Sequence, residues 1–204
     1  MQRISLITLN LWNTEYWQQR RSCVVSFVQT FAADIYCFQE VREQTLSVLD
    51  SALGEYRRIE GPDEGWRCEN SIYVKKSLFT VLDYGRVDLQ MPELHRGVFW
   101  VRLKTADEKA LFVATVHLTH QLNADELRTG IGYRHNEAHL AAKALNFLIG
   151  SDDAILCGDD WSMKSNRSKY EGMQLPVRKA VQSWAAFHDV HVDTSKNTWM
   201  IDKS

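Results

Sequence analysis

The sequence predicts an α/β protein in which strands and helices pack in layers. Apolar runs of strand length alternate with segments whose apolar residues recur at helical spacing, and several strand-like runs follow one another in the middle of the chain. A chain of 204 residues is also long enough to bury one large core. We therefore expect residues 1–204 to form a single domain of this class.

The N-terminal part alternates two expected strands with two expected helices. Ile4 to Leu9 is a nearly continuous apolar run that is too short for a helix, so it predicts a strand. Trp17 to Phe31 carries a helical apolar stripe, and Asp34 to Phe38 is a second buried strand that ends in the polar pair Gln39-Glu40. Residues 43–53 predict another helix, with leucines on one face.

The rest of the chain begins with consecutive strands. We expect them at 71–74, 78–84, 97–103 and 111–117, with residues 104–109 as a hairpin connection. A long helix is expected at 133–149, followed by a buried strand at 154–157 that ends in Gly158-Asp159-Asp160. A last helix is expected near 177–187.

Composition limits the location and the partners of the protein. The formal net charge of −2 gives no support for non-specific nucleic-acid binding, although it does not exclude it. No apolar stretch has the length of a membrane span, and the N-terminus lacks the features of a secretory signal. The four cysteines are scattered without a C-x-x-C pair, and three of them sit in apolar runs, which favours reduced, buried thiols. We therefore expect a cytoplasmic or nuclear protein without a membrane span.

Four polar residues at the ends of expected strands could together perform phosphoryl chemistry. Mg²⁺ prefers oxygen ligands and is usually held by one or two carboxylates plus substrate phosphate. Glu40 suits the role of its anchor, and the amide of Asn10 could supplement it or orient the nucleophile. Asp159 could accept a proton from water, while His117 could donate a hydrogen bond to a phosphoryl oxygen.

Each of these residues also has a purely structural explanation. Asn10 could form a turn, and Glu40 could simply be the first solvated residue after a strand. His117 could be a buried histidine with satisfied hydrogen bonds, and Asp159 could cap a helix or form a turn. No one of these signals is specific by itself.

In order, however, the segments resemble one known family. Thr8-Leu9-Asn10-Leu11-Trp12-Asn13 and Asp34 to Val41 are similar to the first two signatures of the endonuclease/exonuclease/phosphatase superfamily. Thr115-Val116-His117-Leu118 resembles its strand-end histidine motif, and Arg134-His135-Asn136-Glu137-Ala138 its arginine-led helix. Ile155 to Asp159 matches the start of its Gly-Asp-x-Asn motif. Gly65-Trp66, Ser71 to Ser77 and Thr198-Trp199 make the chain most similar to the tyrosyl-DNA phosphodiesterase-like branch.

The resemblance implies a four-layer α/β sandwich, in which two packed mixed β-sheets are flanked by helices. It also implies metal-assisted attack of water on a phosphodiester or phosphomonoester, with Mg²⁺, or alternatively Mn²⁺, as cofactor. Glu40 would bind the metal beside Asn10, His117 would contact phosphate, and Asp159 would orient water. The favoured substrate is DNA, RNA or a nucleic-acid adduct. Substrate contacts are expected from residues near the motifs, namely Trp12, His120, Arg134 and Trp161.

Two departures from the family pattern leave other interpretations open. Trp161 stands where the family has a second amide, and an indole offers one donor and no acceptor oxygen. The family's C-terminal Ser-Asp-His signature is also absent, so we expect a C-terminally incomplete domain that lacks its last strands. The alternatives are a phospholipid or inositol-phosphate phosphatase of the same fold, or a catalytically impaired phosphate-binding domain.

Overall fold

Two four-stranded mixed sheets form the centre of the computed structural model, which describes residues 3–120 and 123–159 and the backbone of 191–192 and 201–202. In the first sheet the strand order is β1-β2-β4-β3. Strands β1 and β2 are parallel, and β4 runs antiparallel to both of its neighbours. The bounds are Leu6–Asn10 for β1, Ile35–Gln39 for β2, Tyr56–Arg58 for β3 and Asn70–Lys75 for β4.

The second sheet has the strand order β5-β6-β7-β8. Its first three strands are antiparallel neighbours, whereas β7 and β8 are parallel. The bounds are Phe79–Val87 for β5, Val98–Thr105 for β6, Ala110–His117 for β7 and Asp153–Asp159 for β8. Two further strands, β9 (His191–Val192) and β10 (Ile201–Asp202), pair with each other antiparallel.

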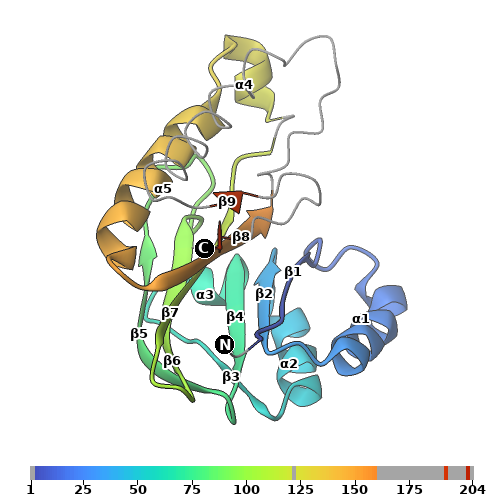
Figure 1. Ribbon diagram of the computed structural model, residues 1–204. Helices are drawn as coiled ribbons and strands as arrows, with labels where there is room; N and C mark the ends of the chain where they lie inside the picture. The colour runs from blue at the N-terminus through green and yellow to red at the C-terminus, as the bar shows by residue number, and fades with distance from the viewer. Residues whose placement is uncertain (1–2, 121–122, 160–190, 193–200, 203–204) are drawn as a thin grey trace.

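Helices cover the outer faces of both sheets and complete four layers (Figure 1). Helices α1 (Trp17–Phe31) and α2 (Glu43–Ala52) pack on the first sheet. Helix α5 (Tyr133–Ile149) packs on the second. The short helices α3 (Gly65–Cys68) and α4 (Ala124–Thr129) precede β4 and α5. Each parallel pair of strands is thus joined by a helical connection, as parallel pairing requires.

Strand alternation divides the apolar residues between separate cores. Ile35 and Cys37 of β2 face the core between the sheets, whereas Tyr36 and Phe38 face the core beneath α1 and α2. A strand covered on both faces needs apolar residues at successive positions, which explains the unbroken apolar run that the sequence shows here. The core between the sheets is called the inter-sheet core below.

The predicted architecture of two mixed sheets flanked by helices is confirmed. Sequence reasoning missed β3, α3 and α4, which span only 3, 4 and 6 residues and are too short to show a periodicity. The helix expected near 177–187 lies outside the described residues. The expected incompleteness at the C-terminus stays a prediction.

All four cysteines are free, as expected, but they are not all buried. Cys37 and Cys157 lie in the inter-sheet core, where burial raises the pKa of the Cys37 thiol and the neighbouring Cys157 raises it further. Cys23 is exposed on α1 because it lies on the face of the helix turned away from the sheet, which corrects the expectation of burial.

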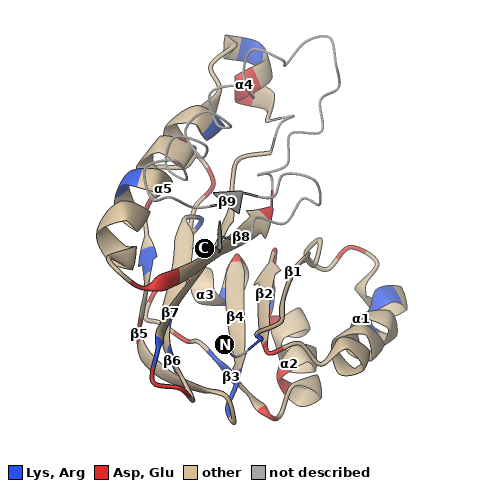
Figure 2. Ribbon diagram, viewed as in Figure 1, with Lys and Arg blue, Asp and Glu red and all other residues tan. Residues whose placement is uncertain are grey.

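Surface charge and helix length agree with the composition. Acidic and basic positions are interspersed over the described helices and strands (Figure 2). None of the described helices combines the length and the apolar character that crossing a membrane requires.

Candidate active site

Four of the side chains predicted to carry chemistry meet at one edge of the two sheets. Asn10 ends β1, Glu40 follows β2, and His117 and Asp159 end the neighbouring strands β7 and β8. The Asn10 Nδ2 amide donates to Glu40 Oε1 at 3.0 Å and to Asp159 Oδ2 at 2.5 Å. His117 Nε2 lies 3.7 Å from Glu40 Oε1. These four residues are called the strand-end cluster below.

Strand alternation explains why three members of the strand-end cluster point between the sheets. Leu6 of β1, Val113 of β7 and Cys157 of β8 pack into the inter-sheet core. Residues an even number of positions further along a strand face the same side. The last residues of β1, β7 and β8 stand at such positions, so their side chains reach the polar end of this core.

Glu40 reaches the cluster because the backbone leaves strand geometry at this residue. Continued alternation after Tyr36 and Phe38 would turn Glu40 toward the helices. Instead its φ of 53° is left-handed, which costs a non-glycine residue about 1–2 kcal/mol. Both carboxylate oxygens gain hydrogen bonds in return, Oε1 from Asn10 and Oε2 from Asn13 Nδ2 at 2.6 Å.

Asn13 is a member of the site that sequence reasoning missed. It lies in the loop between β1 and α1 and has a left-handed φ of 50°. A second amide three residues after Asn10 was the available signal, but periodicity gives no side-chain direction inside a loop. Because Asn10 and Asn13 each hold a different oxygen of Glu40, they fix the plane of its carboxylate.

The surroundings of Glu40 suit a hard cation. Among the described residues no Lys or Arg side chain contacts its carboxylate, whose partners are two amides and His117. The Asp159 carboxylate also accepts a hydrogen bond from the Asn10 amide, so this one amide group donates to two acidic side chains. In the same part of the chain no three His, Cys, Asp or Glu residues form a ready-made metal cluster. Mg²⁺ needs none, because it takes most ligands from water and substrate phosphate.

Asn10 presents its amide nitrogen, not its oxygen, to the two carboxylates. Its Oδ1 accepts a hydrogen bond from the Trp12 backbone N–H at 2.6 Å. This orientation makes Asn10 a positioning group for Glu40 and Asp159. The arrangement gives no support to the expected direct ligation of a metal by Asn10.

A layer of polar side chains joins the two sheets beneath the cluster. Gln39 Nε2 donates to Thr115 Oγ1 at 2.8 Å in the opposite sheet and to Thr8 Oγ1 at 3.1 Å in the neighbouring strand. Gln39 and Thr115 are almost fully buried, so these bonds are protected from water. They hold the ends of β2 and β7 at a fixed separation and thereby position Glu40 against His117.

The remaining predicted substrate contacts have different outcomes. Trp12 is 54% exposed and adjoins the cluster through Asn10. His120 is exposed in the turn after β7, where substrate contact stays a prediction. Arg134 is buried, and its Nη2 lies 3.3 Å from Glu126 Oε2. This ion pair lies inside the fold, and the expected substrate contact of Arg134 stays a prediction. Trp161 lies outside the described residues.

A buried carboxyl group anchors the segment that follows His117. Glu137 of α5 accepts from the Thr119 backbone N–H at 2.9 Å, and Thr119 Oγ1 lies 2.5 Å from its Oε1. The same hydroxyl lies 2.9 Å from Glu93 Oε2. One hydroxyl hydrogen cannot serve two carboxylates, so this geometry favours a proton on one of the acids. Burial raises the pKa of Glu137, and the nearby charges of Glu93 and Glu126 raise it further.

Replacing Glu137 tests this anchor through protein stability. Glu137→Ala should lower the free energy of unfolding by about 1–3 kcal/mol, because the buried Thr119 N–H loses its acceptor. Glu137→Gln keeps an acceptor oxygen and should retain most of that stability. A raised pKa in the folded state makes the parent's contribution largest below the usual value of 4.5, and it is lost as pH rises through the folded-state pKa. Urea unfolding at several pH values measures both effects; a glutamine variant with the parent's pH dependence would refute this explanation.

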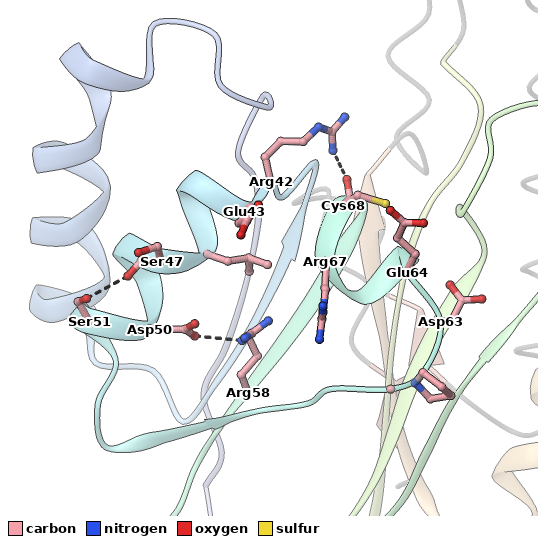
Figure 3. Close-up of a pocket in the computed structure, with 13 residues that line it drawn as sticks. Arg42, Glu43, Ser47, Asp50, Ser51, Arg58, Asp63, Glu64, Arg67 and Cys68 are labelled. Carbon is pink, nitrogen blue, oxygen red and sulfur yellow. Dashed lines mark hydrogen bonds and ion pairs between the residues drawn. The ribbon is translucent and has the colours of Figure 1, made fainter.

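A large cavity elsewhere on the molecule is chemically different from the strand-end cluster. It has a volume of about 1030 Å³ and opens between α2, α3 and the chain near Arg58 (Figure 3). Two of its three arginines have partners: Arg58 Nε lies 3.0 Å from Asp50, and Arg42 donates to the Cys68 carbonyl. Acidic side chains balance the basic ones, so the cavity offers no concentrated charge for a phosphate. No member of the strand-end cluster lines it.

Comparison with solved structures shows the same fold in several proteins. An endonuclease/exonuclease/phosphatase family protein from Bacteroides thetaiotaomicron superposes with a TM-score of 0.68 and 20% identity, covering 88% of this chain and 68% of that one. D. rerio TDP2 complexed with a single-strand DNA product gives 0.64 and 19%, covering 76% and 60%. The B. thetaiotaomicron mannosyl-6-phosphatase Bt3783 gives 0.63 and 21%, covering 77% and 65%. The chain thus spans about 60% of the length of the TDP2 structure.

Sequence comparison identifies the family independently of these structures. No curated protein matches the sequence significantly. The model of the endonuclease/exonuclease/phosphatase family matches residues 7–163, a range that includes all four members of the strand-end cluster. The chain therefore belongs to the endonuclease/exonuclease/phosphatase family.

Proposed function

We propose that this chain is a Mg²⁺-dependent phosphodiesterase that acts on nucleic acid or a nucleic-acid adduct by attack of water on phosphorus. The proposal rests on one arrangement of side chains. The Asn10 amide donates to both Glu40 and Asp159, and His117 lies beside Glu40. Family membership and the similarity to TDP2 bound to a DNA product support the same chemistry.

Glu40 is the residue best placed to hold the cation. Its carboxylate is fixed at both oxygens by Asn10 and Asn13, so it does not have to reorganise on binding. Mg²⁺, or alternatively Mn²⁺, supplies charge neutralisation at the phosphate when bound. Glu40 is also only 15% exposed at its side chain, which strengthens its attraction for a cation relative to a fully solvated carboxylate.

Asp159 and His117 divide the remaining work at the phosphorus. Asp159 holds the attacking water and accepts its proton, since its carboxylate is oriented by the Asn10 amide. His117 donates a ring N–H to a phosphoryl oxygen as negative charge develops there. Because His117 and Asp159 are direct partners in the register of β7 and β8, the two groups approach a substrate from adjacent strands.

A second candidate within the same chemistry is hydrolysis of a phosphomonoester on a sugar, inositol or phospholipid. The similarity to the mannosyl-6-phosphatase of B. thetaiotaomicron favours it, because in the proposed mechanism the strand-end cluster acts on the phosphate and would serve either ester. The identity of the group that flanks the phosphate decides between the two candidates.

Turnover of a defined panel tests the proposal. A chromogenic nucleotide phosphodiester should be hydrolysed with Mg²⁺ and not with EDTA, and excess Mg²⁺ or Mn²⁺ should restore the rate. Oligonucleotides with a 5′ adduct or an abasic site should be better substrates than an inositol phosphate, mannose 6-phosphate or sphingomyelin. Preference for one of the last three would establish the second candidate. Phosphate binding without turnover of any substrate would identify an impaired binding domain and contradict both.

A further inference from the structure

Two exposed aromatic residues lie in the loop that joins β1, which ends at Asn10 of the strand-end cluster, to α1. Trp12 is 54% and Tyr16 65% exposed, and their ring centroids are 5.8 Å apart with the planes inclined at 42°. Aromatic side chains carry a large apolar surface and are normally buried to a high degree. Two such rings exposed in contact with each other therefore form an apolar surface that is available to a ligand.

The backbone ties this surface to the catalytic residues. The Trp12 N–H donates to Asn10 Oδ1 at 2.6 Å, and the adjacent Asn13 donates to Glu40 Oε2 at 2.6 Å. The loop thus contacts the cluster through the Trp12 backbone N–H and through the side chain of the next residue, Asn13. A phosphoester held at Glu40 would therefore place its neighbouring group close to this loop.

The exposure of the rings is built into the loop. Trp12 and Tyr16 have left-handed φ angles of 52° and 51°, which are uncommon for bulky residues. Arg20 donates from Nη2 to the Leu11 carbonyl at 2.9 Å and from Nε to the Glu15 carbonyl at 2.8 Å. Its guanidinium also lies 5.6 Å from the centroid of the Trp12 ring. These contacts hold the Trp12 ring in place before any ligand arrives.

We propose that Trp12 and Tyr16 form a stacking subsite for a nucleobase of the substrate, an inference that rests on the proposed function. Every nucleobase has a flat π-face, and stacking on Trp or Tyr requires no base-specific hydrogen bond. Because the two rings touch and their planes are inclined at 42°, the base stacks on an exposed face of one ring and is not inserted between them. A saturated sugar, an inositol ring or a lipid chain offers only C–H groups, so we expect the subsite to favour nucleotide phosphoesters through the larger π-contact of a base.

Binding in EDTA tests the subsite separately from turnover. The probes are a fluorescent single-stranded oligonucleotide and a strand of equal length with tetrahydrofuran abasic residues, compared by fluorescence anisotropy. The parent should bind the base-bearing strand at least about 5-fold more tightly, as expected for one stacked base. Trp12→Ala with Tyr16→Ala should abolish this preference, and Trp12→Phe should keep most of it. Phe147→Ala is the matched control, because Phe147 is 88% exposed on α5 and should not contribute.

Three results would overturn the subsite. One is equal affinity of the parent for both strands, and another is a preference that survives the double alanine variant. The third concerns competition for the bound strand. Mannose 6-phosphate would displace the strand as effectively as thymidine monophosphate does, and this displacement would depend on Trp12. Metal-dependent turnover without a preference for the base-bearing strand would refute the subsite but not the proposed function. A preference for the base-bearing strand without metal-dependent turnover would refute the proposed function but not base binding at this loop.

Discussion

Glu40→Gln is expected to reduce metal-dependent phosphodiester hydrolysis by roughly 10³-fold or more, since the lost charge removes several kcal/mol of transition-state stabilisation. The substitution keeps the size of the side chain and removes its charge. It also leaves one oxygen where two now accept from Asn10 and Asn13, so the new amide group must face a donor. Both effects weaken cation binding at the same place.

The measurement is kcat/KM for a chromogenic nucleotide phosphodiester over a range of Mg²⁺ concentrations, with thermal unfolding to confirm an intact fold. Glu43→Gln is the matched control, because Glu43 is exposed in the first turn of α2, three residues further along the chain. The kcat/KM of Glu43→Gln should stay within about twofold of the parent's value, because salt screens the interactions of a solvent-exposed charge. Activity of Glu40→Gln equal to that of the parent would remove Glu40 from the mechanism.

Asp159→Asn is expected to lower kcat by roughly 10²- to 10⁴-fold, the contribution usual for a general base. An amide cannot accept the proton of the attacking water. The variant still fills the position next to Asn10, so substrate binding and KM should change little. A fall in kcat without a matching rise in KM would place the effect in the chemical step.

A control variant separates the loss of proton transfer from the general effect of removing a carboxylate from β8. Asp153→Asn is the control, because Asp153 begins the same strand, is exposed and lies at its opposite end. A comparable fall in kcat for Asp153→Asn would contradict the assignment of Asp159 as the proton acceptor.

The sequence was sufficient to predict the layers and the long elements. Residues such as Ile35 and Tyr36 alternate between two apolar cores, and that arrangement is visible as an unbroken apolar run. The convergence of positions 10, 40, 117 and 159 was also predictable, because polar residues that end neighbouring strands share an edge. Their chemical roles rest on the proposals above and on the variants that test them.

Other features depended on geometry that no local pattern encodes. The left-handed backbone at Glu40 overrides strand alternation, and it places Asn13 within hydrogen-bond distance of the carboxylate. The motif of Arg134 suggested a substrate contact, and it gave no sign of the ion pair with the buried Glu126. Both outcomes depend on tertiary contacts between segments that are separated in sequence, or on loop conformation, and neither leaves a periodic signal.

The most direct test of the central claim is to locate a bound cation. Crystals grown with Mn²⁺ should show an anomalous scattering peak at the Glu40 carboxylate, on the side that faces Asp159, and crystals of Glu40→Gln should lack it. A Mn²⁺ peak bound elsewhere in the parent, or an empty Glu40 carboxylate at saturating Mn²⁺, would contradict the assignment of this strand-end cluster as a metal-dependent catalytic centre.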